Sequence, residues 1–138
     1  MRDYIIDGHS DILLNYYRDK NYKFNKNTNF HCDLHKMKKG KIALEVFAAC
    51  SCLKGKDALV KTLNLVDKFN YLVNENSEVE LVKGYKDIFK ITSKDKIAAL
   101  LAIEGADGIL DLSILRVFYK LGVRLITLCW NHRNHIAE

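Results

Sequence analysis

Apolar residues in this chain fall into two kinds of segment. Short, nearly continuous apolar runs cover residues 4–6, 42–50, 97–103 and 123–130. Such runs, bounded by polar turns, are typical of strands in a parallel sheet that is covered on both faces. In longer segments the apolar positions recur every three to four residues, which predicts amphipathic helices over 56–74, 85–91 and 112–121. The chain therefore alternates predicted strands and helices.

Shorter features are predicted between the first two strands. Ser10 or Asp11 can cap a helix that begins at Ile12. The segment 19–29 is rich in Asn and Lys and predicts a surface loop, while a helical turn over 33–40 ends at a glycine. Aromatic residues are expected to anchor the loop: Tyr22, Phe24 and Phe30.

The order of the main predicted elements is strand, helix, strand, helix, strand, helix, strand. Repeated βα units imply an α/β fold with parallel strands and right-handed crossovers. The length of 138 residues suits a single domain over residues 1–138. About four βα units suffice for a small doubly wound sheet, and they also make half of an eight-stranded barrel. Periodicity alone leaves both architectures open.

Composition and charge narrow the classes of function. The hydrophobic fraction of 49% and the charged fraction of 28% are those of a globular domain. No apolar run reaches the roughly 18–20 residues of a membrane span, and the N-terminus lacks a secretory signal, so we expect a cytoplasmic protein with no membrane partner. The net charge of +5 comes mostly from lysines that are not interleaved with aromatic residues, which favours a solvated surface over nucleic-acid binding.

The chain has 4 cysteines, at positions 32, 50, 52 and 129, and no Cys-x-x-Cys pair. Cys50 and Cys52 are spaced too tightly for an ordinary zinc ribbon, and the other two lie far away in the sequence. Without a secretion signal, reduced thiols are the expected state.

Candidate chemistry begins at the end of the first predicted strand, with His9 and Asp11. In a regular strand, side chains two residues apart point to the same side, so an imidazole and a carboxylate would lie side by side. These groups are ligands of divalent metals such as Zn²⁺. The alternative is a capped turn, in which Asp11 or Ser10 only begins the following helix.

A second candidate ligand, Glu104, ends the predicted strand over 97–103. Parallel strands bring their carboxyl ends to one rim of a sheet or barrel, so Glu104 is expected near His9 and Asp11. A carboxylate at the end of a buried strand is costly unless it is paired or bound to a cation. A helix-capping or salt-bridged carboxylate is the alternative.

These motifs, taken in order, resemble the membrane dipeptidase family of zinc metallopeptidases, also called the renal dipeptidase family. The resemblance is carried by segments 7–11, 33–34, 39–40, 103–106 and 115–131, which span nearly the whole chain. It implies that the chain is the N-terminal part of a (β/α)₈ TIM-type barrel with two Zn²⁺ ions at its rim. It also implies a metallo-dipeptidase that hydrolyses dipeptides, some with a D-residue at the C-terminal side. By the family pattern, His9 and Asp11 bind one zinc ion and Glu104 bridges both.

The chain departs from the family pattern in two respects. The family completes its second metal site with two later histidines and transfers protons through a later aspartate, so these residues are expected beyond Glu138. Some members also carry a substrate-contacting histidine where this chain has Trp130, and the spacing of His132 and His135 shows no substitute. No substrate-binding residue is therefore assigned.

Two other functions remain open from the sequence. A half barrel exposes the edges of its first and fourth strands, so the chain could be a catalytically silent protein that self-associates as a homo-oligomer. It could instead belong to another metal-dependent barrel hydrolase that acts on non-peptide amides or lactones. Such amidohydrolases usually begin with His-x-His, whereas this chain has His9-x-Asp11.

Overall fold

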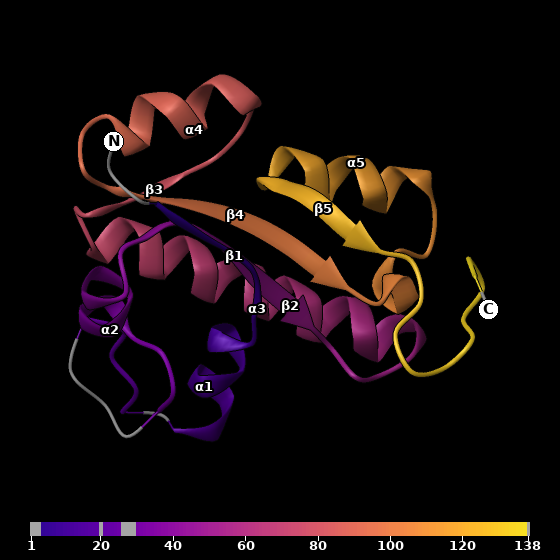
Figure 1. The fold of residues 1–138 in the computed structure, drawn as a ribbon. Helices are drawn as coiled ribbons and strands as arrows, with labels where there is room; N and C mark the ends of the chain where they lie inside the picture. Colours follow the sequence, from indigo (N-terminus) through magenta and orange to yellow (C-terminus); the bar gives the residue numbers. More distant parts are fainter. Residues whose placement is uncertain (1–3, 20, 26–29, 138) are drawn as a thin grey trace.

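A computed structural model describes residues 4–19, 21–25 and 30–137. The elements of its α/β fold are shown in Figure 1. In chain order they are β1 (Ile5–Ser10), α1 (Ile12–Arg18), α2 (Leu34–Lys39), β2 (Ile42–Cys50), α3 (Gly55–Glu75), β3 (Val79–Leu81), α4 (Tyr85–Thr92), β4 (Ile97–Glu104), the 3-10 turn η1 (Ala106–Gly108), α5 (Leu112–Lys120) and β5 (Val123–Thr127). The predicted alternation of helices and parallel strands is confirmed.

The strands pair in the order β1-β2-β4, and all pairs are parallel. The second edge of β4 is shared, because β3 pairs with Ile97–Ala99 and β5 with Leu101–Glu104. Without the short β3, the strands follow one another across the sheet in sequence order. A doubly wound sheet reverses its order at a switch point, so this succession is that of a barrel.

The structure corrects two strand predictions. The strand β3 was not predicted, because three residues with a glutamate in the middle give no periodic signal. The last strand ends at Thr127 rather than at Trp130. Its partner β4 ends at Glu104, and there the chain turns through Gly105 into η1, so Leu128 to Trp130 have no strand to pair with.

Helices cover the two faces of the sheet unequally. One face, here called the outer face, carries Phe47, Leu101 and Ile103, which pack in one core with apolar residues of α1, α3 and α5. The opposite, inner face carries Leu44, Val46, Ala98 and Ala102. Side chains alternate along a strand, so Cys50 and Glu104 also belong to the inner face.

The helix α4 covers only part of the inner face. Its Ile91 and Ile88 pack with the residues of the inner face nearer the amino ends of β2 and β4. In Figure 1, α4 and α3 lie on opposite sides of the sheet, with α4 near the start of β4. The carboxyl ends of the strands are left free of α4, and this is the rim where Glu104 lies.

The loop after α1 is anchored by aromatic side chains, as predicted. Tyr22 and Phe24 are buried, and Phe30 is half-buried with its ring 5.2 Å from that of Tyr22. Residues 20 and 26–29 of the predicted loop lie outside the described residues.

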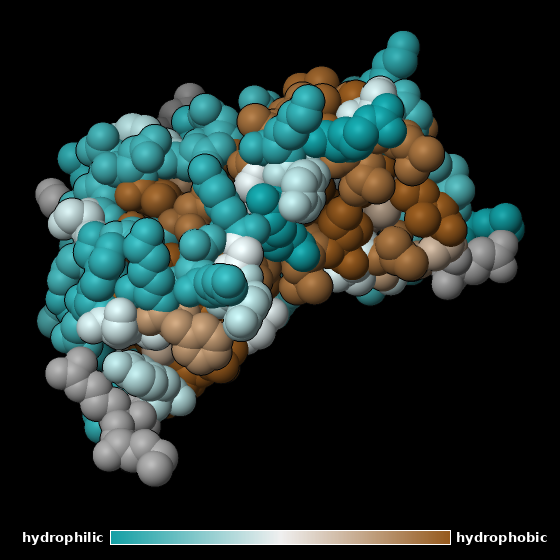
Figure 2. Space-filling model, turned by 90° about the horizontal axis from the view of Figure 1, so that it is seen from above, coloured by the Kyte–Doolittle hydropathy of each residue, from teal (hydrophilic) through white to brown (hydrophobic). Residues whose placement is uncertain are grey.

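The two outer strands are exposed. Within the described part of the chain, β1 pairs only with β2, and β5 pairs only with β4. Figure 2 shows apolar side chains gathered on the surface toward the α5 and β5 side, where Leu112, Val117, Leu121 and Leu125 are exposed. Self-association through these edges stays a prediction. None of the described helices has the length and hydrophobicity to span a bilayer.

Candidate metal centre

The first candidate ligand, His9, lies in an irregular part of β1. Asp7 pairs with Glu45 and Ser10 with Phe47, so three steps along β1 match two steps along β2. The extra residue is a β-bulge, a feature that redirects side chains near active sites. The Asp7 carboxylate accepts a hydrogen bond from the His9 backbone N–H at 3.1 Å, which holds the turn. The regular-strand geometry expected from the sequence is therefore replaced by a bulge.

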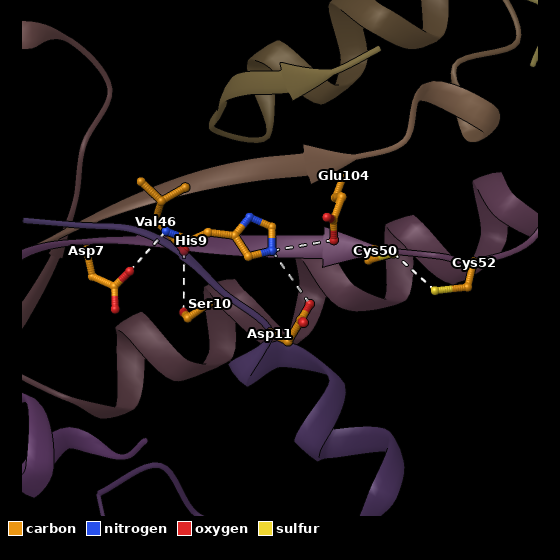
Figure 3. A network of polar contacts seen from close by, with 8 residues as sticks. All are labelled: Asp7, His9, Ser10, Asp11, Val46, Cys50, Cys52 and Glu104. Atoms are coloured by element: carbon orange, nitrogen blue, oxygen red, sulfur yellow. Dashed lines mark hydrogen bonds and ion pairs between the residues drawn. The ribbon is translucent and has the colours of Figure 1, made fainter. Parts of the chain in front are cut away.

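Asp11 occupies the N-cap position of α1, but its carboxylate makes no capping hydrogen bond within the described structure. The N-cap position belongs to Asp11 rather than to Ser10, whose hydroxyl donates to the Val46 carbonyl oxygen at 3.4 Å. By contrast, Asp33 and Asp111 accept hydrogen bonds from the first turns of α2 and α5. The Asp11 side chain is thus turned toward His9 instead of toward its own helix (Figure 3).

Glu104 is held at the rim by the turn that follows it. Gly105 has a φ of 81°, in the left-handed region that favours glycine. Its N–H donates to the Thr127 carbonyl oxygen at 3.1 Å, which ties the turn to β5. A Cβ at Gly108 would lie 2.9 Å from the Leu59 nitrogen, so η1 packs directly on the α3 backbone. These contacts fix the direction in which Glu104 leaves β4.

The three side chains converge from β1 and β4. His9 Nε2 lies 3.5 Å from Glu104 Oε2 and 4.0 Å from Asp11 Oδ1. One ligand atom from each residue lies within 4.8 Å of the others. In Figure 3, dashed lines run from one ring nitrogen of His9 to both carboxylates. Two carboxylates around one imidazole concentrate negative charge, which a cation would neutralise.

The donor set fits a zinc ion. Tetrahedral Zn²⁺ binds imidazole nitrogen and carboxylate oxygen at about 2.0–2.2 Å, which places ligand atoms roughly 3.4 Å apart. The distances of 3.5 and 4.0 Å around His9 Nε2 are close to that spacing. Three protein ligands with one open position are typical of a catalytic zinc site. The Glu104 side chain is only 17% exposed, whereas His9 and Asp11 are about half exposed, so the site is open on the β1 side.

A small pocket adjoins the candidate centre. Its lining includes Cys52, Lys54, Glu104, Asp107, Trp130 and His132. This pocket was not predicted from the sequence. The sequence does contain a signal for it, because residues 51–54 and 130–132 lie in loops that follow strands, and such loops meet at one rim of the sheet.

The histidines near the end of the described chain do not join His9, Asp11 and Glu104. His132 lies in the adjoining pocket with its ring 6.5 Å from the Trp130 ring. His135 Nε2 lies 2.7 Å from the Ile109 carbonyl oxygen, so this ring binds the backbone after η1.

A second carboxylate, Glu45, is buried on the outer face of β2. It is 0% exposed, and neither carboxylate oxygen has a hydrogen-bond partner within the described structure. Burial raises the pKa of Glu45 to about 7; the nearby Ser10 hydroxyl opposes this shift, and the Asp7 carboxylate adds to it. This residue was predicted only as part of an apolar strand.

Curated relatives of the chain are dipeptidases. Dipeptidase 3 from Macaca fascicularis is 29% identical over 147 residues, which cover 100% of this chain and 30% of that protein. Dipeptidase ataJ from Aspergillus terreus is 36% identical over 84 residues, which cover 59% of this chain and 20% of that protein. The chain therefore spans less than a third of the length of either relative.

Solved structures of metallopeptidases share the fold. Dipeptidase AC, a metallopeptidase of family M19, matches with a TM-score of 0.85 at 20% identity, covering 94% of this chain and 44% of that one. A metallopeptidase from Rhodobacter sphaeroides, bound to a phosphinate mimic of L-Ala-D-Ala, matches at 0.84 with 18% identity, covering 94% and 46%. An amidohydrolase from Pseudomonas aeruginosa matches at 0.66 with 25% identity, covering 73% and 30%.

The family assignment rests on the sequence over nearly its whole length. At the identities of the first two structures, their likeness concerns the fold alone, and it agrees with the barrel-type succession of strands. The family model of the membrane dipeptidases matches residues 2–138. The chain therefore belongs to the membrane dipeptidase family, peptidase family M19.

Proposed function

We propose that this chain supplies part of the active centre of a zinc-dependent dipeptidase. His9 and Asp11 would hold one zinc ion, and Glu104 would be shared between this ion and a second. The observation that carries the proposal is the convergence of the three side chains, with one ligand atom from each within 4.8 Å of the others. The side chain of Asp11 is available because it does not cap α1.

Each ligand has a distinct role. The His9 imidazole would offer Nε2 to the cation, while Asp11 and Glu104 would bring negative charge. Glu104 has two carboxylate oxygens, so it is able to serve two cations at once. A zinc pair supplies Lewis acidity that activates water and polarises the scissile carbonyl. The partly buried position of Glu104 strengthens its attraction to cations, because the surroundings are less polar than water.

Dipeptides are the proposed substrates. The support comes from the curated relatives, which are dipeptidases, and from the R. sphaeroides metallopeptidase bound to a mimic of L-Ala-D-Ala. We extend to this protein the hydrolysis of dipeptides with a D-residue at the C-terminal side. Following the family pattern, we place the remaining ligands of the second zinc and the proton-transfer residue outside residues 1–138.

Zinc titration of the purified chain tests the centre. We expect Zn²⁺ binding to weaken at least about 100-fold in Glu104→Gln and in His9→Ala, because even residues that only orient a metal ligand cost up to about that factor. The matched controls are Glu75→Gln and His35→Ala, whose side chains are exposed away from the rim. Isothermal titration calorimetry gives the affinities, and circular dichroism checks folding. Full zinc affinity in a folded Glu104→Gln variant contradicts the assignment.

A substrate panel tests the reaction. The zinc-loaded protein is offered L-Ala-D-Ala and other dipeptides beside lactones and cyclic amides. Dipeptide hydrolysis that is lost in His9→Ala supports the proposal, whereas hydrolysis of lactones alone favours the amidohydrolase alternative. Stoichiometric zinc without turnover in the 138-residue chain means that the chain by itself is catalytically silent.

A further inference from the structure

Two thiols lie beside Glu104 and take no part in the proposed zinc centre. Cys50 is the last residue of β2 and is directly opposite Glu104 in the strand register. Cys52 follows two residues later and lines the same pocket as Glu104. Their Sγ atoms are 3.1 Å apart, and a dashed line joins the two residues in Figure 3. This separation is about 1 Å longer than the ~2.05 Å of a disulfide bond.

The backbone brings these two side chains together. Cys52 has a φ of 54°, in the left-handed region that side chains other than glycine rarely occupy. The Ser51 hydroxyl accepts a hydrogen bond from the Leu53 N–H at 3.3 Å, which stabilises the turn. The turn therefore returns the Cys52 side chain toward the end of β2. A left-handed conformation costs roughly 1–2 kcal/mol for a residue with a Cβ, so the rest of the loop must compensate for it.

We propose that Cys50 and Cys52 are a redox-active pair that forms a reversible intramolecular disulfide at the rim of the sheet when the protein meets a peroxide. The inference does not depend on the proposed dipeptidase function, because it concerns the thiols alone. It also differs from the sequence-based expectation that the thiols stay reduced.

The oxidation proceeds in two steps. The Cys52 sulfur attacks one oxygen of hydrogen peroxide, the O–O bond breaks, and Cys52 becomes a sulfenic acid as one water leaves. The Cys50 sulfur then attacks the Cys52 sulfur, the S–O bond breaks, and the hydroxyl leaves as a second water. Two thiols lose two electrons in total, and the peroxide is reduced to two waters.

Exposure determines which sulfur reacts first. Cys52 is exposed, whereas Cys50 is 2% exposed. Burial keeps peroxide away from the Cys50 sulfur, which suppresses its direct oxidation. Cys50 is therefore suited to resolve the sulfenic acid on Cys52, which lies within 3.1 Å. A disulfide in so short a loop is strained and accessible, which makes it easily reduced again.

The disulfide would alter the wall of the pocket beside Glu104. In the reduced protein, this wall carries the exposed Cys52 thiol next to Lys54 and Glu104. Oxidation removes both thiol protons and links the end of β2 to the turn. The competing explanation is a weak S–H···S hydrogen bond between two inert thiols, which gives the same short separation without any oxidation.

Peptide mapping of the full chain separates these explanations. The protein is treated with hydrogen peroxide, unfolded, alkylated and digested with trypsin, which cleaves after Lys41 and Lys54. Both cysteines then lie on peptide 42–54, while Cys32 and Cys129 lie on peptides 27–36 and 125–133. We expect peptide 42–54 to lose both alkylation sites and the mass of two hydrogen atoms, and to regain both sites after treatment with dithiothreitol. The other two peptides stay alkylated at the same peroxide dose.

Three results would overturn the proposal: full alkylation of peptide 42–54 after peroxide, sulfinic acid on Cys52 without a disulfide, or a cross-link to Cys32 or Cys129. The variant Cys52→Ser provides the control, since its exposed side chain is not needed for packing. In this variant we expect Cys50 to remain fully alkylated after the same treatment. A disulfide from Cys50 to another cysteine in this variant would contradict the specific pairing.

Discussion

Glu45 and Glu104 lie on neighbouring strands and occupy opposite environments. Glu104 ends β4 at the rim, 3.5 Å from the imidazole of His9. Glu45 lies in the middle of β2 on the helix-covered outer face, is 0% exposed, and has no hydrogen-bond partner for either oxygen within the described residues. The role of each carboxylate therefore depends on its position along the strand and on the face of the sheet that carries it. At the rim it is able to bind a cation, whereas under the helices it only lowers stability.

The side chains that surround Glu45 and Glu104 also differ. Near Glu45 the outer face is packed with aromatic rings, and Phe47 lies 6.0 Å from Phe24 and 5.4 Å from Phe69 between ring centroids. The rim instead gathers polar groups from the loops that follow β1, β2, β4 and β5. Stability and chemistry are therefore separated in space, and substitutions in the two regions should have separable effects.

The largest expected effect is on the outer face. Phe47→Ala should lower the free energy of unfolding by about 3–5 kcal/mol, because a fully buried ring is removed from between α3 and the sheet. Chemical denaturation measures this loss. The control Phe89→Ala removes a ring that is 67% exposed and should change stability by less than about 0.5 kcal/mol. Similar losses in both variants would remove the distinction between the two regions.

The next effect depends on pH. The pKa of Glu45 rises from 4.5 in the unfolded chain to about 7 in the folded protein. Below pH 4.5 the carboxyl is protonated in both states, so it has no effect on stability. As the pH rises from 4.5 to 7, only the unfolded state releases the proton, so stability falls, and above pH 7 the loss stays constant.

Glu45→Gln should therefore stabilise the protein by roughly 3 kcal/mol at pH 8 and by much less at pH 5. Denaturation at both pH values measures the difference. The exposed Glu75→Gln serves as the matched control, and we expect no comparable pH dependence from it. If Glu45→Gln is equally stable relative to the native protein at both pH values, Glu45 is not a buried carboxyl with a raised pKa.

A smaller effect is expected at the rim itself. Gly105→Ala places a Cβ 3.3 Å from Asp107 Oδ2 and 3.4 Å from the Trp130 Cβ, at a φ of 81°. The left-handed conformation should cost about 1–2 kcal/mol of stability. The shift of the turn should also weaken zinc binding by Glu104. Gly122→Ala is the matched control, because Gly122 also has a left-handed φ, of 109°, but precedes β5 at the end away from the rim. Calorimetry and denaturation of both variants decide whether the turn positions Glu104.

Much of the fold could be predicted from the sequence, because its signals are local. The apolar runs that formed β2 and β4 are long and bounded by turns, and the helical period of α3 extends over 21 residues. Tyr22 and Phe24 anchor the loop because large apolar rings are costly to expose. Strand β3 is too short to produce a period, and the end of β5 depends on where β4 turns away.

The convergence of the three candidate ligands at the rim could be predicted from the sequence, but its geometry could not. His9, Asp11 and Glu104 were predicted because strand ends meet at one rim, and the structure brings them together. The bulge at His9 depends on the register between two strands that are 36 residues apart at Ser10 and Val46, which the local pattern does not contain. The approach of Cys50 to Cys52 depends on the left-handed conformation of Cys52, which the Cys-Ser-Cys sequence alone does not predict.

The position of α4 also bears on the direction from which a small molecule reaches Glu104. This helix fills the inner face at the amino ends of β2 and β4, while the adjoining pocket opens among the loops at the carboxyl ends. A small molecule can therefore reach Glu104 from the loop side, where the pocket opens. The side chains of the loops after β2 and β5 border this approach, so substitutions there should change which small molecules come close to Glu104.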